Sequence, residues 1–212
     1  METKNTEAAQ STVSSVWPGM ILGEVLGYGA HGLVYALASC ESVCIKFILD
    51  PLTTRSKCIE IENQRRMEPV APAVLDSIIV LNKWNLINPL EPYREASFVG
   101  LLLMEKLTPF TPRVKGDIQK FALDQSRLLR ELASLSRDNN IVHDDVHQTN
   151  HFMYNSEGKL KLIDWGRTTP YHDEESLEHY IYDSTPEELD SVASHPTIPV
   201  FSLILRTLGL PA

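Results

Sequence analysis

The sequence predicts an α+β fold, with strands dominating the first half of the chain and helices the second. Apolar runs bounded by turn residues predict strands at 17–26, 33–38, 43–47, 77–87 and 98–103. Apolar residues recur at helical spacing in two other segments, Thr53–Met67 and Asp117 to about Arg137. We therefore expect a five-stranded antiparallel sheet with one helix, followed by a shorter, mainly helical part.

Length and charge limit the functional classes. The chain has 212 residues, 43% of them hydrophobic, which suffices for one domain or for two small lobes with a core. Its formal net charge of −9 offers no basic stripe for a phosphate backbone. We therefore do not expect nucleic-acid binding by bulk charge, and a neutral or basic partner is easier to accept.

Cysteine usage and apolar runs indicate a soluble protein of a reducing, cytoplasmic compartment. Cys40, Cys44 and Cys58 are odd in number and form no C-x-x-C pair, which favours neither a disulfide framework nor a zinc site. The longest apolar stretches, such as Phe98–Met104, are far shorter than the roughly 18 residues of a membrane span. Residues 1–16 are polar and lack the order of a signal peptide, so we expect a flexible tail there.

A glycine pattern joins the first two predicted strands at Gly27, Gly29 and Gly32. The pattern G-x-G-x-x-G opens the helix of a Rossmann unit but also occurs in tight bends. Here the chain continues into Leu33-Val34-Tyr35, a strand-forming run, with no amphipathic helix to meet a pyrophosphate. This continuation argues against a Rossmann unit.

The segment Ile141–Gly166 carries the most specific pattern. Its apolar runs His151–Tyr154 and Lys159–Ile163 flank the turn signal Asn155-Ser156-Glu157-Gly158, which predicts a hairpin. Polar and acidic residues border both runs on their outer sides. The hairpin would therefore bring together side chains that are distant in the sequence.

Three of these side chains are Asp145, Asn150 and Asp164. Oxygen ligands of this kind suit Mg²⁺ that bridges the phosphates of a nucleotide. The alternative is a polar loop with a capped turn. The ordered set of motifs from Gly27 to Gly166 argues against that alternative.

The glycine pattern and the strand that follows resemble those of protein kinases. The family has G-x-G-x-x-G-x-V followed by V-A-I-K, and Val43-Cys44-Ile45-Lys46 resembles the second motif. The resemblance implies an ATP site whose covering loop consists of Gly27, Tyr28, Gly29, Ala30, His31, Gly32 and Val34. It also implies that Lys46 binds the phosphates, although Lys46 alone would read as a solvated strand-edge lysine.

In this family a glutamate from the next helix holds the lysine. Glu62 stands sixteen positions after Lys46 and is the partner that we expect. Glu60 lies two residues away and would face elsewhere on the helix. Each of these glutamates is otherwise an ordinary surface charge.

The run Leu103–Leu107 is similar to the hinge between the lobes of a kinase. By this resemblance the backbone near Glu105 and Leu107 would bind the adenine edge, with Met104 behind it. The alternative is a core strand that enters the loop Pro109–Pro112. The resemblance implies a bilobal kinase-like fold, with an N-lobe at 17–105 and a reduced C-lobe at 106–212.

His143, Asp145 and Asn150 keep the spacing of the kinase loop H-R-D-x-x-x-x-N, and Asp164-Trp165-Gly166 resembles D-F-G. By the resemblance, Asp145 accepts or orients the proton of the attacking hydroxyl. Asn150 and Asp164 would be the ligands of Mg²⁺. ATP and Mg²⁺ are therefore the expected cofactors.

Three positions depart from the kinase pattern. Asp144 replaces the arginine that pairs with a phosphorylated activation loop in many kinases, which implies activity without that control. His147 stands where serine/threonine kinases have a lysine near the γ-phosphate and resembles the histidine of aminoglycoside and choline phosphotransferases; we include it among the catalytic candidates. Trp165 replaces a phenylalanine and needs a roomier pocket.

The last forty or so residues match the family only as helices. We expect a helix to begin at Thr185-Pro186-Glu187-Glu188 and another to run over Pro199–Leu208. No A-P-E motif occurs, and the peptide-binding part is reduced. Compact kinases of this type include the small atypical kinase of the tRNA threonylcarbamoylation complex and minimal bacterial effector kinases, both of which use partners. A protein substrate or regulatory protein is therefore expected, although no particular partner is transferred.

Three functions remain open at this point. The first is a serine/threonine protein kinase, because the lysine, glutamate, base and metal ligands all have candidates. The second is a small-molecule phosphotransferase, favoured by His147 and Asp144. The third is a nucleotide-binding pseudokinase scaffold. The resemblance covers about Ile21–Arg167.

Overall fold

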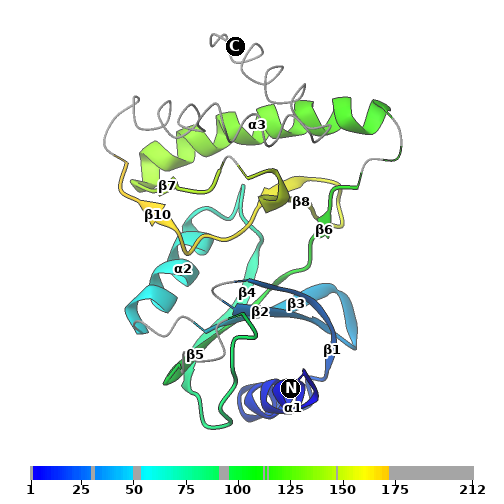
Figure 1. Cartoon of the computed structure of the whole chain (residues 1–212). Coiled ribbons are helices and arrows are strands. Elements are labelled where there is room, and N and C mark those ends of the chain that lie inside the picture. Colours follow the sequence, from blue (N-terminus) through cyan, green and yellow to red (C-terminus); the bar gives the residue numbers. More distant parts are fainter. Residues whose placement is uncertain are drawn as a thin grey trace. The chain divides into compact units, whose positions relative to one another are not determined.

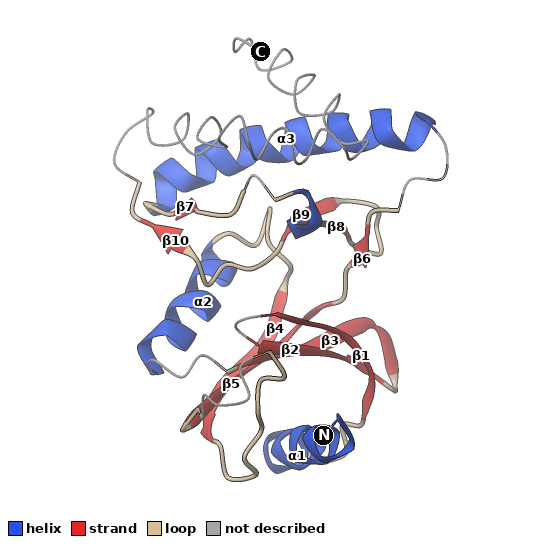
Figure 2. Cartoon of the chain, in the orientation of Figure 1, coloured by secondary structure: helices blue, strands red, loops and turns tan. Residues whose placement is uncertain are grey.

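The structure, a computed structural model, describes residues 2–29, 32–49, 54–90, 96–111, 113, 115–146 and 148–171. These residues form an α+β fold with three α-helices and a five-stranded antiparallel sheet (Figures 1 and 2). The chain divides into two compact units. The first comprises Met1–Glu68 and Pro72–Lys106, and the second comprises Pro69–Ala71 and Leu107–Ala212. The helices expected at Thr185 and Pro199 lie outside the described residues.

The sheet of the first unit confirms the five predicted strands. Its order is β1-β2-β3-β5-β4, and every neighbouring pair is antiparallel. The strands are β1 (Leu22–Gly29), β2 (Gly32–Leu37), β3 (Cys40–Ile48), β4 (Val74–Leu81) and β5 (Phe98–Glu105). Strand β4 ends before the predicted Ile87 because the Asn82 side chain closes a loop, with Nδ2 donating to Leu86 O and Oδ1 accepting from Leu86 N.

The prediction of a flexible tail at 1–16 is wrong, because helix α1 (Glu2–Val16) occupies this segment. Ala9, Thr12 and Val13 are fully buried, and α1 packs on one face of the sheet. The Asn5 side chain fixes the helix by donating to Ile87 O at 2.8 Å and accepting from Ile87 N at 3.0 Å. Small apolar residues at helical spacing form the buried side, although polar neighbours dominate the composition of the segment.

Helix α2 (Thr54–Arg66) covers the other face of the sheet, opposite α1 (Figure 1). Because side chains alternate along a strand, β3 points Ile45 and Phe47 toward the α1 side and Lys46 toward the α2 side. The α1 side holds the larger apolar cluster, with Leu33, Tyr35, Phe47, Val99 and Leu101 among its buried members. The α2 side holds a smaller one of Cys44, Ile48, Ile61, Leu102 and Met104.

The second unit is built on the long helix α3 (Lys115–Asn139), which confirms the predicted helix. Its strands and 3₁₀ turn are β6 (Thr108–Pro109), β7 (Val142–His143), η1 (Thr149–His151), β8 (Phe152–Tyr154), β9 (Leu160–Leu162) and β10 (Thr168–Thr169). Phe121 of α3 stacks on Phe110 at 4.2 Å and meets Phe152 edge-on. Among the described residues, no helix is both long and apolar enough to cross a membrane.

The predicted hairpin is confirmed as β8 and β9, with Phe152 paired to Leu162 and Tyr154 to Leu160. The Asn155 side chain shapes the turn by accepting hydrogen bonds from Glu157 N and Lys159 N. Strand β6 pairs with the other edge of β8. A separate antiparallel pair, β7 with β10, joins Val142 and His143 to Thr169 and Thr168.

Candidate functional site

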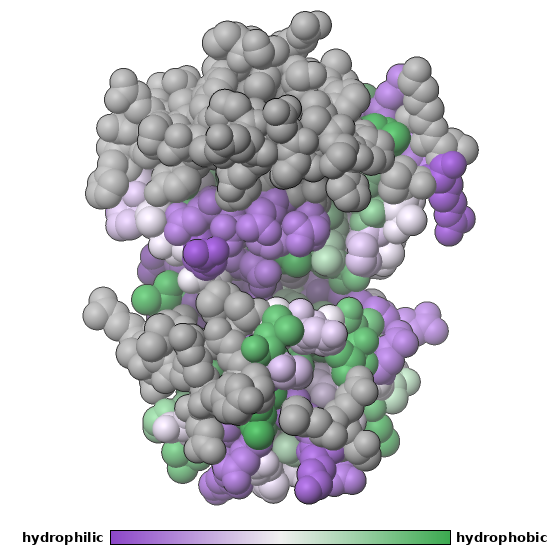
Figure 3. Space-filling model, in the orientation of Figure 1, coloured by the Kyte–Doolittle hydropathy of each residue, from purple (hydrophilic) through white to green (hydrophobic). Residues whose placement is uncertain are grey.

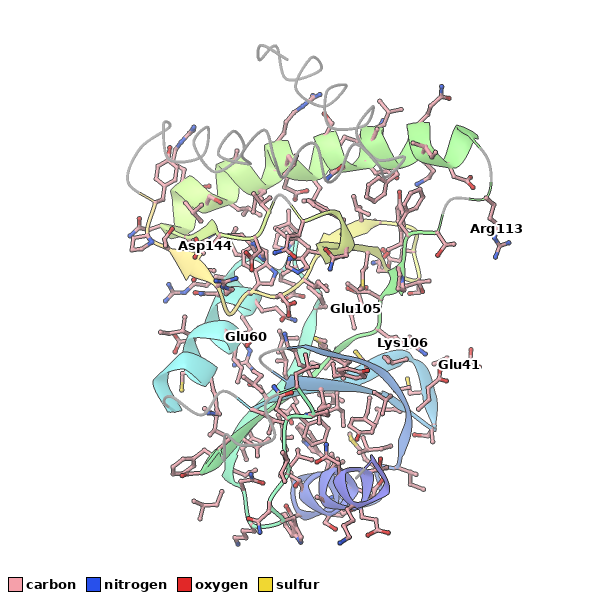
Figure 4. The ribbon with its side chains drawn as sticks, viewed as in Figure 1. Glu41, Glu60, Glu105, Lys106, Arg113 and Asp144 are labelled. Carbon is pink, nitrogen blue, oxygen red and sulfur yellow. The ribbon has the colours of Figure 1, made fainter. Side chains whose placement is uncertain are left out.

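A buried ion pair lies in the first unit between β3 and α2. Lys46 pairs across the sheet with Val34 of β2 and Leu102 of β5, so its side chain emerges among apolar neighbours. Its Nζ lies 2.7 Å from Oε1 of Glu60, and the two side chains are 10% and 3% exposed. Figure 4 labels Glu60 on α2. Lys46 is therefore held in a fixed position by a charge that the next helix supplies.

The prediction that Glu62 pairs with Lys46 is wrong, since Glu62 is exposed on the far side of α2. Two residues correspond to about 200° around a helix, so Glu60 and Glu62 cannot face the same way. The sequence held a signal for Glu60, because Gln64 and Met67 continue its stripe at i+4 and i+7 and are both buried. The side of α2 that a glutamate faces therefore indicates the partner of Lys46 better than the number of residues between the two in the sequence.

The glycine pattern spans the β1–β2 hairpin, in which Gly27 faces Val34 and Gly29 faces Gly32. A Cβ on Gly32 would lie 1.8 Å from Phe47 O, so the packing of β2 against β3 requires glycine there. Gly27 and Gly29 differ, because no described atom lies within 4 Å of a Cβ added to either. Their open space suits a loop that a phosphate approaches closely.

The remaining residues of the predicted loop are Tyr28, Ala30, His31 and Val34. Ala30 and His31 at the tip lie outside the described residues. Tyr28 is 61% exposed, and Val34 packs partly against the apolar cluster on the α2 side. Asn88 Nδ2 donates to Gly29 O at 3.1 Å, which anchors the end of β1 beside the tip.

The predicted hinge lies at the end of β5. Met104 is buried and accepts a hydrogen bond from Gln64 Nε2 at 3.4 Å through its sulfur. Glu105 N donates to Ala73 O at 2.9 Å, so this N–H is not available to an adenine edge. Leu107 is the first residue of the second unit after this strand.

In the second unit, His143 organises the loop that carries Asp145. Its Nδ1 accepts a hydrogen bond from Asp145 N at 3.2 Å, so the ring proton sits on Nε2 and is donated to Ile163 O at 2.8 Å. Burial lowers the pKa of His143 to about 4, so the ring is neutral at pH 7. The ring meets Trp165 edge-on at 4.9 Å. His143 thus joins the Asp145 loop to the strand end that leads into Asp164.

Asp145 itself is nearly buried, with a side chain 11% exposed. Nη1 of Arg167 lies 3.4 Å from each of its two carboxylate oxygens. The sequence did not single out Arg167. Two features of the sequence could have indicated it. Arg167 directly follows the D-W-G motif, and Asp144 stands where the kinase loop has an arginine.

The two expected magnesium ligands lie on adjoining chain segments. Ile163 N donates to His151 O at 3.0 Å. Asn150 directly precedes His151, and Asp164 directly follows Ile163. Asp164 has a positive φ of 66°, its side chain is 44% exposed, and Oδ2 lies 3.7 Å from Nε2 of His151. One carboxylate and one exposed amide fit Mg²⁺, which takes few protein ligands when phosphates supply the rest.

No three His, Cys, Asp or Glu side chains in the described ranges gather as a metal-binding group. The Asn150–Asp164 pair does not depend on such a group, because one of its ligands is an amide. His147, the other catalytic candidate of the Asp145 loop, lies outside the described residues. On the face drawn in Figure 3, hydrophilic residues gather on the described part of the second unit.

The chain after Trp165 is fastened to the Asp145 loop. Asp144 N donates to Arg167 O at 3.1 Å, and Thr169 Oγ1 donates to an Asp144 carboxylate oxygen at 3.1 Å. Burial raises the pKa of Asp144, and the bond from Thr169 partly counters this. Trp165 is fully buried, with Nε1 donating to Leu162 O at 2.8 Å. The larger ring therefore has the roomier pocket that the sequence required.

The structure brings Lys46 together with a glutamate in the first unit, and links Asp145, Asn150 and Asp164 through His143 and His151 in the second. No protein-family model matches the chain, and no curated protein has a significantly similar sequence.

Proposed function

We propose that the chain is an ATP-dependent phosphotransferase of the protein-kinase type that transfers the γ-phosphate to a serine or threonine hydroxyl. The observation that carries the proposal is the buried pair of Lys46 and Glu60. Kinases need a lysine on the third strand of the sheet, paired with a glutamate from the following helix. In this chain β3 and α2 supply those two residues.

The cost of burial favours a functional role for this pair. Removing two charges from water costs several kcal/mol per ion, and an apolar pair of similar size is often as stable or more so. The α2 side already has Ile48, Ile61 and Leu102 to pack. A buried lysine held at a fixed point is therefore better explained by an anionic ligand, such as the phosphates of a nucleotide.

The second unit supplies groups for the transfer. Asp145 would accept the proton of the acceptor hydroxyl while the hydroxyl oxygen bonds to the γ-phosphorus. The bond between that phosphorus and its bridging oxygen breaks, and ADP leaves. Asn150 and Asp164 would hold Mg²⁺, which offsets negative charge on the phosphate oxygens. His143 orients the loop through Asp145 N and Ile163 O.

The contacts of Asp144 support activity without phosphorylation of the following segment. In kinases that need it, a phosphate orders that segment by pairing with an arginine. Here Thr169 donates directly to Asp144, and β7 pairs with β10. These contacts fasten residues 167–169 to the Asp145 loop without a phosphate, which supports the proposed independence from phosphorylation.

Two measurements test the proposal. ATP with Mg²⁺ should raise the melting temperature, because ligand at about a hundred times Kd adds roughly 2.7 kcal/mol to the unfolding free energy. Labelled γ-phosphate should then pass to a protein substrate. Asp145→Asn should lower the rate of transfer by about a hundred- to ten-thousandfold, to a residual rate that can still be measured, and should keep the thermal shift.

The choice of acceptors separates the alternatives. Transfer to aminoglycosides or choline but not to proteins would replace the kinase proposal with a small-molecule phosphotransferase. A thermal shift without transfer to any acceptor would indicate a nucleotide-binding scaffold. No thermal shift and no transfer would reject all three functions.

A further inference from the structure

We infer that Arg167 is a positioning residue for the catalytic base: its guanidinium holds the carboxylate of Asp145 in the orientation that receives the acceptor's proton. This inference rests on the proposed function. Its geometric basis is the contact of one guanidinium nitrogen, Nη1, with both oxygens of Asp145 at 3.4 Å. Nη1 therefore lies equally far from the two carboxylate oxygens.

Arg167 is fixed at both its backbone and its side chain. Its carbonyl oxygen accepts a hydrogen bond from Asp144 N at 3.1 Å, and Thr168, the next residue, pairs with His143 across β7 and β10. The guanidinium therefore starts from a backbone that the Asp145 loop itself holds. This arrangement restricts where Nη1 can reach.

Asp145 depends on this contact. Among the described residues, the hydrogen bonds and ion pairs of its carboxylate come from Arg167. The Asp145 side chain is 11% exposed, whereas that of Arg167 is 60% exposed. Little water therefore reaches the carboxylate to replace the hydrogen bonds that Arg167 donates to it. A nearly buried carboxylate without a partner is unfavourable and free to rotate away.

The sign of the charge also matters, because acids surround this position. Asp144 directly precedes Asp145 in the loop, and Asp164 follows Ile163, whose carbonyl oxygen accepts the hydrogen bond from His143. Arginine keeps its charge at all working pH values. A lysine supplies the same charge from a side chain of different length and shape, which makes Arg167→Lys an informative conservative variant.

A double-mutant cycle tests the inference with the full chain. Transfer of γ-phosphate is measured for Arg167→Ala, Arg167→Lys, Asp145→Asn and the double variant Arg167→Ala/Asp145→Asn. We expect Arg167→Ala to lower kcat by about ten- to a hundredfold with little change in KM for ATP, because misplacing a reacting group costs on this scale. Arg167→Lys should recover part of the loss. In the Asp145→Asn background, Arg167→Ala should have no further effect.

Arg127→Ala is the matched control, because Arg127 forms an exposed ion pair with Asp124 at 3.7 Å on α3 of the same unit. It should leave kcat unchanged, and melting temperatures establish that each variant folds. Unchanged kcat in Arg167→Ala would overturn the inference, as would an equal loss in both backgrounds. A rise in kcat would also overturn it, since the arginine would then block the base. If the wild-type chain transfers no phosphate, the proposed function fails as well, so the two failures are distinguishable.

Discussion

The two faces of the five-stranded sheet differ in the side chains that they bury. The α1 face is mainly apolar, with Phe47 and Leu101 fully buried in its cluster. The α2 face has a smaller apolar cluster and also buries Lys46, Lys57 and Glu60. Lys46 and Phe47 are neighbours on β3 and point to opposite faces. The apolar packing that stabilises the sheet and the ion pair on which the proposed function rests thus lie on opposite sides of the same strands.

The first way to break this comparison is Phe47→Ala. Phe47 is fully buried and meets Tyr35 edge-on at 5.6 Å, so the variant loses packing on the α1 face. We expect the free energy of unfolding to fall by about 3–5 kcal/mol, with kcat little changed in the protein that remains folded. Chemical denaturation measures the first quantity. Glu41→Ala on the exposed end of the same strand should change it by less than about 0.5 kcal/mol.

The second is the double variant Lys46→Met/Glu60→Leu, which replaces the buried charges with apolar side chains. Stability should be unchanged or higher, because both desolvation costs disappear together. Turnover should fall by about a hundred- to a thousandfold, the usual effect of losing one charged or hydrogen-bonding group at a reacting centre. A large loss of stability with normal turnover would reverse the assignment of the two faces.

The third compares Glu60→Gln with Glu62→Gln. The first change removes the charge 2.7 Å from Lys46 Nζ, whereas the second alters an exposed side chain two residues away on α2. We expect turnover to fall about tenfold in Glu60→Gln, equivalent to about 1.4 kcal/mol, and to stay unchanged in Glu62→Gln. Equal effects would mean that the ion pair does not matter for the reaction.

The sequence predicted what local pattern controls. The strands followed from apolar runs, and the β8–β9 hairpin followed from the turn signal at Asn155–Gly158. The tail prediction failed because Ala8, Ala9 and Val13 of α1 are small and stand among polar residues. Such a segment gains its helix from packing on the sheet rather than from its own propensity.

The candidate site was only partly predictable. Motif spacing gave Lys46 and Asp145 as candidates, and their roles stay predictions. The pairing of Lys46 with Glu60 rather than Glu62 depends on the rotational phase of α2, which a count along the chain does not contain. The contact of Arg167 with Asp145 depends on the pairing of β7 with β10, two strands of two residues each. Strands this short leave no periodic pattern in a sequence.

The last prediction changes no residue of the chain and concerns Cys44, which lies on the α2 face two residues from Lys46 on β3. Burial raises the pKa of its thiol to about 12, from an ordinary value of 9.0. The folded state therefore favours the neutral thiol. The contribution of Cys44 to the free energy of unfolding is fully present below pH 9 and falls as the pH rises toward 12.

Near pH 8 we expect iodoacetamide to label Cys44 about a thousandfold more slowly than an ordinary thiol, since the thiolate is the reactive form. Cys58, which is half-buried, serves as an internal reference in the same mass spectrum. Rapid labelling of Cys44 in the folded chain would mean that water reaches the α2 face freely, and the buried charges of Lys46 and Glu60 would then need no functional explanation.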